Sequence, residues 1–402
     1  MSIAIAARLR RVKPSPSSAA TDRLAELRRE GRDIVSLLVG EPDFDTPAPI
    51  RRAAIEAIEG GQTRYTQTAG TLALRQAVAA KLQRENGLAY APGQIIVTVG
   101  AKHAIFNALS VTVEAGSEVI IPAPYWVSYP DMVLACGGEP VIVPCAESDG
   151  FLLTAAALEA AITPRTRWLI LNSPSNPTGA AYGAAQLRAL ADVLLRHPQV
   201  AVLTDDIYEH IRFGAPESPH LAAIEPALLA RTLVVNGVSK TYAMTGWRIG
   251  YAAGPAALIA AMDMIQSQST SCACSVSQAA ALAALQGGMD FLPDWVATYR
   301  ARRDRALALV NAIPGLRCSA PEGAFYLFVH CGGLIGRRTA AGRQLTTDLD
   351  VSLFLLEDAR VAAIAGTCYG LSPYLRLSIA TGIDVIEEAC RRMAAAIARL
   401  AD

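Results

Sequence analysis

Short apolar runs alternate with segments of helical periodicity along the middle of the chain, between about residues 94 and 255. Runs with the composition of buried strands occupy residues 94–100, 117–124, 139–146, 166–174, 200–208, 231–239 and 247–254. Residues 101–113 and 184–197 are among the segments between them in which apolar residues recur at helical spacing. Short strands that are apolar on both faces and alternate with helices are typical of a mostly parallel sheet between helical layers. The pattern therefore predicts an α/β domain with a mostly parallel, seven-stranded sheet.

The pattern changes after residue 255. Helical periodicity predicts helices at 255–269, 290–313 and 384–400, strands are predicted at 323–331 and 373–381, and the polar stretch 337–348 predicts a surface loop. These elements indicate a second, smaller α+β domain. We place the N-terminal arm and part of the small domain at 1–46, the large domain at 47–299 and the small C-terminal domain at 300–402.

Composition excludes several classes of function. The 36 basic and 36 acidic side chains balance to zero, so nothing favours binding to nucleic acid or to an anionic membrane. Charged, Gly or Pro residues break every apolar run before the roughly 20 residues that a membrane span needs. At the N-terminus the charges follow the apolar part, the reverse of a secretory signal. The eight cysteines have no zinc-site spacing, and we expect reduced thiols in a cytoplasmic protein.

Polar residues follow the predicted strands at the edge where open α/β sheets bind ligands. Gly100, Ala101 and Lys102 open a helix, whose free backbone N–H groups favour a phosphate. Trp126 follows the next strand as either a core residue or a wall for a planar ligand, and Asn176 lies in a turn that is structural or presents its amide to a ligand.

The next three predicted strands carry, or lead directly into, charged groups that need partners. Asp205 directly follows an apolar strand and needs a positive or proton-donating partner, and Tyr208 is close by. Lys240 lies among small and apolar residues, where the pKa of an amine tends to fall and the amine becomes a nucleophile toward aldehydes. Arg248 lies in an apolar run and should face an anion such as a phosphate.

One ligand accounts for all of these groups together. Pyridoxal 5'-phosphate is planar, carries a phosphate and an aldehyde, and has a ring nitrogen that a carboxylate keeps protonated. Lys240 is therefore the residue that we expect to hold this cofactor.

The stretch GVSKTYAMTGWRIG, from Gly237 to Gly250, resembles the lysine motif of the class I pyridoxal-phosphate aminotransferases over its full length. The similarity extends from VGEPDFDTP (39–47) to LRLSIAT (375–381). It implies the fold-type I transferase fold and, in the bacterial aspartate aminotransferase branch, a ping-pong transfer of the amino group from aspartate to 2-oxoglutarate. Some members of that branch also use prephenate.

The resemblance implies a role for each candidate residue. Lys240 binds the cofactor covalently and moves the substrate α-proton, Asp205 pairs with the ring nitrogen, and Arg376 binds the α-carboxylate. The implied cofactor contacts are Gly100, Ala101, Lys102, Trp126, Asn176, Asp205, Tyr208, Ser239, Lys240, Arg248 and Tyr65, and the implied substrate contacts are Gly40, Lys102, Trp126, Asn176 and Arg376. Tyr65 reaches the phosphate of a neighbouring subunit, which implies a homodimer with shared sites.

The sequence departs from the family in two places. Gly237 stands where a serine is usual, and STSCACS (269–275) replaces a common Asn-Pro turn. No arginine occurs between residues 266 and 286, where animal-type relatives place the one that reads a distal carboxylate. Lys102 is the cation that we expect to bind the distal carboxylate in place of this arginine. Relatives that use prephenate pair this lysine with a threonine, and Ser17 occupies the position of that threonine here.

Two other classes of function remain open from the sequence. A lyase or decarboxylase could act on the same bound cofactor, although Arg376 would fix the α-carboxylate against loss. A non-enzymatic regulatory relative would be expected to lack Lys240, Asp205 or Arg376, all of which are present.

Overall fold

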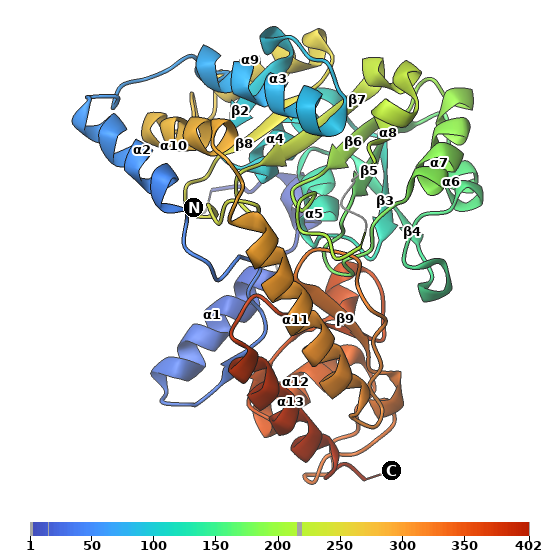
Figure 1. Cartoon of the computed structure of the whole chain (residues 1–402). Coiled ribbons are helices and arrows are strands. Elements are labelled where there is room, and N and C mark those ends of the chain that lie inside the picture. Colours follow the sequence, from blue (N-terminus) through green and yellow to red (C-terminus); the bar gives the residue numbers. More distant parts are fainter. Residues whose placement is uncertain (1–2, 15, 215–218, 402) are drawn as a thin grey trace.

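The computed structural model describes residues 3–14, 16–214 and 219–401, without the side chains of residues 16–19 and 21. Figure 1 shows a larger body that contains a twisted sheet and a smaller body that contains the C-terminus. Among the described residues, no helix is long and apolar enough to cross a membrane.

The large body is built on one mixed sheet in the strand order β2-β8-β7-β6-β5-β3-β4. Its strands are β2 (Ile95–Thr98), β3 (Glu118–Ala123), β4 (Glu139–Pro144), β5 (Thr166–Asn172), β6 (Ala201–Asp205), β7 (Thr232–Gly237) and β8 (Gly250–Ala253). Strand β8 runs antiparallel to both of its neighbours, and the other pairs are parallel. The prediction of a mostly parallel, seven-stranded sheet is confirmed.

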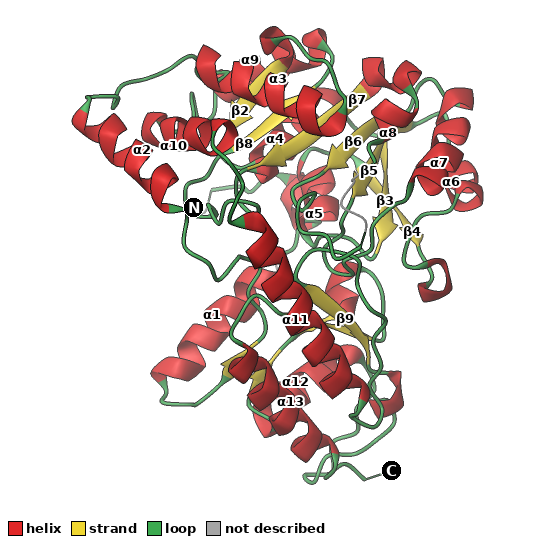
Figure 2. Cartoon of the chain, viewed as in Figure 1, coloured by secondary structure: helices red, strands yellow, loops and turns green. Residues whose placement is uncertain are grey.

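Helices cover both faces of this sheet (Figure 2). They are α2 (Ala48–Glu59), α3 (Leu72–Asn86), α4 (Ala101–Thr112), α5 (Ser128–Ala135), α6 (Ala155–Ala161), α7 (Ala184–Arg196), α8 (Leu221–Ile224), α9 (Ala256–Ser267) and α10 (Ser275–Gln286). Ile95 and Val97 pack with α2, α3 and α10, whereas Ile96 packs with α4, α5 and α9. Successive residues of β2 thus enter opposite cores, which is why the strand is apolar throughout.

The small body combines a three-stranded antiparallel sheet with helices. Its elements are α1 (Pro16–Arg29), β1 (Val35–Ser36), α11 (Leu292–Asn311), β9 (Tyr326–His330), α12 (Asp348–Asp358), β10 (Val361–Ala362), β11 (Ile364–Ala365), β12 (Tyr374–Ser378) and α13 (Ile383–Ile397). The strand order is β11-β12-β9, and β1 pairs with β10. The N-terminal segment therefore packs on the C-terminal part of the chain.

Helix α11 passes from the large body to the small one (Figure 1). It continues without a break through residue 299, where we placed the end of the large domain. The domain boundaries stay a prediction.

Candidate active site

A pocket of about 450 Å³ lies at the carboxyl ends of the parallel strands. The strands lead several predicted side chains to it, because parallel strands all end at the same edge of the sheet. The predicted residues that line it are Gly40, Ala101, Lys102, Trp126, Asn176, Asp205, Tyr208, Ser239, Lys240, Arg248 and Arg376. Arg376 comes from β12 and Gly40 from the segment after β1, so the pocket draws on both bodies.

Lys240 follows β7, and its ammonium donates a hydrogen bond of 2.6 Å to the carbonyl of Gly40. Loss of hydration in the pocket lowers the pKa of Lys240 to about 8, and the charges of Arg248 and Arg376 act in the same direction against the opposing effect of Glu41. A larger share of this amine is therefore neutral near pH 7 than in a lysine exposed to solvent.

Asp205 ends β6 and is only 4% exposed. Burial raises its pKa to about 6, although the hydroxyl of Tyr129 donates a hydrogen bond of 2.7 Å to Oδ2 and opposes the rise. The amide of Ile207 donates to Oδ1 at 3.4 Å. A carboxylate in this position gains most from a partner that carries a proton and a positive charge.

Arg376 is buried, and its two terminal nitrogens donate hydrogen bonds to Oδ1 of Asn176 (3.2 Å) and to the carbonyl of Leu38 (2.6 Å). Its Nε is buried without a partner among the described residues. No carboxylate among these residues pairs with the guanidinium. A buried, unneutralised guanidinium at a pocket wall favours an anionic ligand.

The start of α4 and Arg248 form a second cationic region. Gly100 has φ +85°, and a Cβ there would lie 2.4 Å from Nη2 of Arg248, so the backbone and the guanidinium can approach only because the residue is glycine. Arg248 donates to the carbonyls of Thr245 (2.8 Å) and Val99 (3.5 Å), and in the described part of the chain it has no acidic partner. With the N–H groups of the helix start, it fits a phosphate.

Lys102 lies on the Trp126 side of the pocket, with its ammonium 4.8 Å from the centre of the indole ring. Partial burial lowers the pKa of Lys102, and the charge of Arg248 adds to this. Four cationic side chains, Lys102, Lys240, Arg248 and Arg376, thus share the pocket with the two carboxylates Glu41 and Asp205. The surplus of positive charge suits ligands with several negative charges.

Gly100 and Tyr65 are the predicted cofactor contacts that do not line the pocket. Gly100 shapes the helix start without lining the pocket itself. Tyr65 is 91% exposed and does not line the pocket of its own chain. The backbone amide of the adjacent Thr66 donates a hydrogen bond of 3.4 Å to the sulfur of Cys272. The stretch 269–275, which differs from the family pattern, therefore contacts the residue next to Tyr65. The side chain of Ser17 lies outside the described residues.

Gly237 lies where two strands approach each other closely. A Cβ at this position would lie 2.9 Å from the carbonyl oxygen of Ile249 and 3.0 Å from Cα of Gly250. The close approach of β7 and β8 here leaves no room for a serine side chain unless the backbone shifts.

Sequence reasoning missed some residues of the site. Tyr129 in α5 donates to Asp205, the hydroxyls of Tyr208 and Tyr326 are 2.9 Å apart, and Thr245 donates to Glu41 at 2.6 Å. The only available signal for Tyr129 was a tyrosine three residues after Trp126, which is equally typical of a core position.

Comparisons of the sequence with known proteins all indicate the aminotransferases. The family model of the class I and II aminotransferases matches residues 32–393. An aspartate aminotransferase of Rhizobium meliloti is 54% identical over 94% of this chain and 92% of its own length. An aspartate/prephenate aminotransferase of Cereibacter sphaeroides is 52% identical over 98% of both chains.

Solved structures agree with this match. The crystal structure of the aspartate aminotransferase from Rhizobium meliloti superposes with a TM-score of 0.97 at 51% identity, with all of both chains covered. The aspartate aminotransferase from Thermus thermophilus with maleate gives a TM-score of 0.92 at 39% identity, with 98% of this chain and all of that chain covered.

The fold and the pocket define a pyridoxal-phosphate enzyme of fold type I. The chain belongs to the class I and II aminotransferases, as the resemblance of its lysine motif indicated. Its cofactor is pyridoxal 5'-phosphate. The pocket fits this group, because it combines a nucleophilic lysine, a buried carboxylate and a cationic helix start.

Proposed function

We propose that the protein is an aspartate aminotransferase, which moves the amino group of L-aspartate to 2-oxoglutarate. The observation that carries the proposal is that Arg376 and Lys102, two cationic side chains without acidic partners in the described part of the chain, share one pocket with Lys240. A dicarboxylic amino acid offers one carboxylate to each. The relatives named aspartate aminotransferase support the same choice of substrate, as does the structure of the Thermus thermophilus enzyme with maleate.

The cofactor, when bound, withdraws electrons from the substrate α-carbon, and this chain's residues prepare the site for it. Lys240 would hold the cofactor through its aldehyde carbon and, once the substrate amine replaces it there, would be the amine that takes and returns the α-proton. Asp205 keeps the ring nitrogen protonated, and Tyr129 fixes the orientation of this carboxylate. Tyr208, Asn176 and Trp126 line the pocket, where Tyr208 and Asn176 would hold the ring hydroxyl and Trp126 would provide a flat wall.

Anion recognition is divided among the cations. Arg248, Ser239 and the backbone of residues 100–102 would hold the phosphate. Arg376 and the backbone of Gly40 would hold the substrate α-carboxylate. Asn176 already orients the Arg376 guanidinium. Lys102 binds the distal carboxylate, and this role competes with a role for Lys102 at the phosphate.

Substitution of Lys102 tests whether this residue makes the enzyme prefer acidic amino acids. We expect Lys102→Ala to lower kcat/KM for aspartate and glutamate by about 10²-fold, the scale of a lost charged contact, and to affect alanine or aromatic amino acids far less. The measurement is the conversion of the bound cofactor's absorbance by each amino acid in turn. An equal loss for acidic and neutral substrates would assign Lys102 to the phosphate or to the fold.

Prephenate is a second candidate acceptor. It is favoured by the aspartate/prephenate aminotransferase of Cereibacter sphaeroides, which is 52% identical over 98% of this chain. Adding prephenate to the aminated form of the enzyme, and following the return of the original absorbance, distinguishes it from an enzyme that accepts only 2-oxoglutarate.

The homodimer and the location are also proposals. Tyr65 is exposed in its own chain, which suits a contact with a neighbouring copy. We place the protein in the cytoplasm because its eight cysteines are free thiols, as is usual in a reducing compartment.

A further inference from the structure

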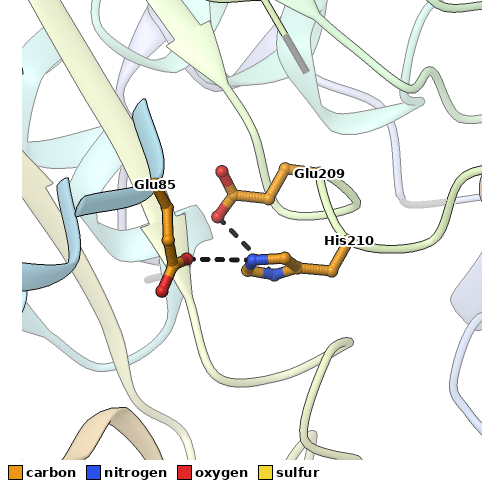
Figure 3. Close-up of side chains that lie close together, drawn as sticks. All are labelled: Glu85, Glu209 and His210. Atoms are coloured by element: carbon orange, nitrogen blue, oxygen red, sulfur yellow. Dashed lines mark hydrogen bonds and ion pairs between the residues drawn. The ribbon is translucent and has the colours of Figure 1, made fainter. Parts of the chain in front are cut away.

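A group of polar side chains lies behind the pocket, between α3 and the segment that follows β6. Figure 3 shows the imidazole of His210 between the carboxylates of Glu85 and Glu209, and Nε2 of His210 is 3.0 Å from Glu85. This trio has the composition of a metal site. The ammonium of Lys81, however, already contacts Glu209 and lies 3.5 Å from Glu85. Lys81 neutralises the carboxylates, so a second cation would meet a buried positive charge.

Glu209 is the centre of a three-way contact. It accepts hydrogen bonds from Lys81, from Nδ2 of Asn86 (2.8 Å) and from Nδ2 of Asn236 (2.5 Å). Lys81 and Asn86 belong to α3, whereas Asn236 belongs to β7. Glu209 itself follows β6, so one carboxylate connects three elements that are distant in sequence.

The connected segments carry pocket residues on their other side. Residues 205–210 include Asp205 and Tyr208, and residues 236–241 include Ser239 and Lys240. A second link joins the same two segments, because Nδ1 of His210 is 3.1 Å from Oγ1 of Thr241. Two links, one on each side of Lys240 in sequence, therefore set the distance between the segments.

We propose that Glu209 and Asn236 are positioning residues, which hold the segment of Asp205 and Tyr208 at a fixed distance from the segment of Lys240. This proposal rests on the proposed function, since it concerns the same pocket. Neither side chain lines the pocket, so both act through the residues that do.

The physical basis is the cost of rearranging a buried charge. Glu209 and Lys81 are nearly inaccessible to water, and a buried carboxylate that loses a donor recovers no hydration. The amide of Asn236 is itself oriented, because its oxygen accepts from the backbone N–H of Gly237 at 2.7 Å. Few other arrangements of these side chains would therefore have a similar energy. Such rigidity suits a site in which the proton donor and acceptor must stay at a fixed distance from each other.

The informative substitution is Asn236→Ala. Replacing Glu209 instead would remove the ion-pair partner of the buried Lys81 ammonium and destabilise the fold. Asn236→Ala keeps that ion pair and removes one of the two links between the segments, together with the hydrogen bond that the Asn236 oxygen accepts from Gly237. We expect the pH titration of the bound cofactor's absorbance, which follows the nitrogen contributed by Lys240, to shift by about 0.5 unit or more. We also expect kcat for aspartate to fall by about 10-fold with little change in KM.

A matched control is Asn107→Ala. Asn107 is equally buried, and its amide donates to Gln266 at 3.0 Å between α4 and α9, away from both segments. A wild-type titration in Asn107→Ala together with a shifted one in Asn236→Ala supports the proposal. A wild-type titration in Asn236→Ala, or the same shift in both variants, overturns it. If Asn236→Ala does not fold, Thr241→Val breaks the second link at nearly constant volume and is judged by the same criteria.

The titration needs no substrate, so it separates this proposal from the proposed function. A wild-type protein that binds pyridoxal phosphate but does not convert aspartate would contradict the proposed function and leave the titration comparison valid.

Discussion

At the scale of single residues, replacement of Lys240 is expected to cause the largest loss of activity. We expect Lys240→Ala to lower transamination by about 10⁴-fold or more, because the covalent attachment and the proton transfer are lost together. The fold should persist, since the hydrogen bond that this ammonium donates goes to the backbone carbonyl of Gly40 at the pocket wall. Steady-state rates with aspartate and a thermal unfolding curve check both statements. A variant with near-normal rates would contradict the assignment of Lys240.

The lowered pKa of Lys240 predicts a pH dependence for cofactor attachment. The neutral amine attacks the aldehyde, and the ammonium does not. Because the pKa is about 8 in the cofactor-free protein, the rate constant of attachment should rise as the pH increases toward 8 and level off above it. Stopped-flow mixing of cofactor-free protein with pyridoxal phosphate between about pH 6 and pH 10 measures this. A rate constant that still rises steeply at the upper end of this range, as expected for the ordinary lysine value of 10.5, would show that the pocket does not lower the pKa.

At the scale of elements, the start of α4 allows a prediction that depends on the absence of a side chain at Gly100. Gly100→Ala should weaken pyridoxal phosphate binding by about 10-fold or more, because a Cβ at this left-handed position would displace Arg248. Gly116→Ala is the matched control: its φ of +87° is nearly the same, and a Cβ there would meet nothing within 4 Å. Dissociation constants from fluorescence titration compare the two. Equal weakening would mean that backbone strain alone is responsible.

Elements also show what the sequence could and could not predict. The strands of the large sheet were predictable because their residues enter cores on both faces. Lys240, Asp205 and Arg248 were recognisable because charged groups in apolar surroundings need partners, whereas Arg376 was implied only by the resemblance to the family. The two-residue strands β1 and β10 are too short to leave a pattern. The hydrogen bond from Tyr129 to Asp205 joins residues 76 apart in sequence, and nothing local in either segment signals it.

At the scale of the whole molecule, the exposed Tyr65 predicts sites shared between two copies of the chain. We expect Tyr65→Ala to lose about 10-fold in activity through a weakened phosphate contact. A hybrid of a Tyr65→Ala chain with a Lys240→Ala chain should regain one intact site, since each supplies what the other lacks. Co-expression with random pairing should then restore about a quarter of the wild-type activity. No recovery in the hybrid would show that Tyr65 does not act across a dimer.

The contact between Arg376 and the carbonyl of Leu38 joins residues 338 apart in sequence. During synthesis on the ribosome, the segments that surround the cofactor emerge well before Arg376 does. The residues to which we assign pyridoxal phosphate are therefore synthesised before the residue to which we assign the α-carboxylate of the amino acid. If Arg376 binds the α-carboxylate as we propose, activity requires the last part of the chain to fold back onto the first. We therefore expect a translation product that stops before Arg376 not to consume aspartate.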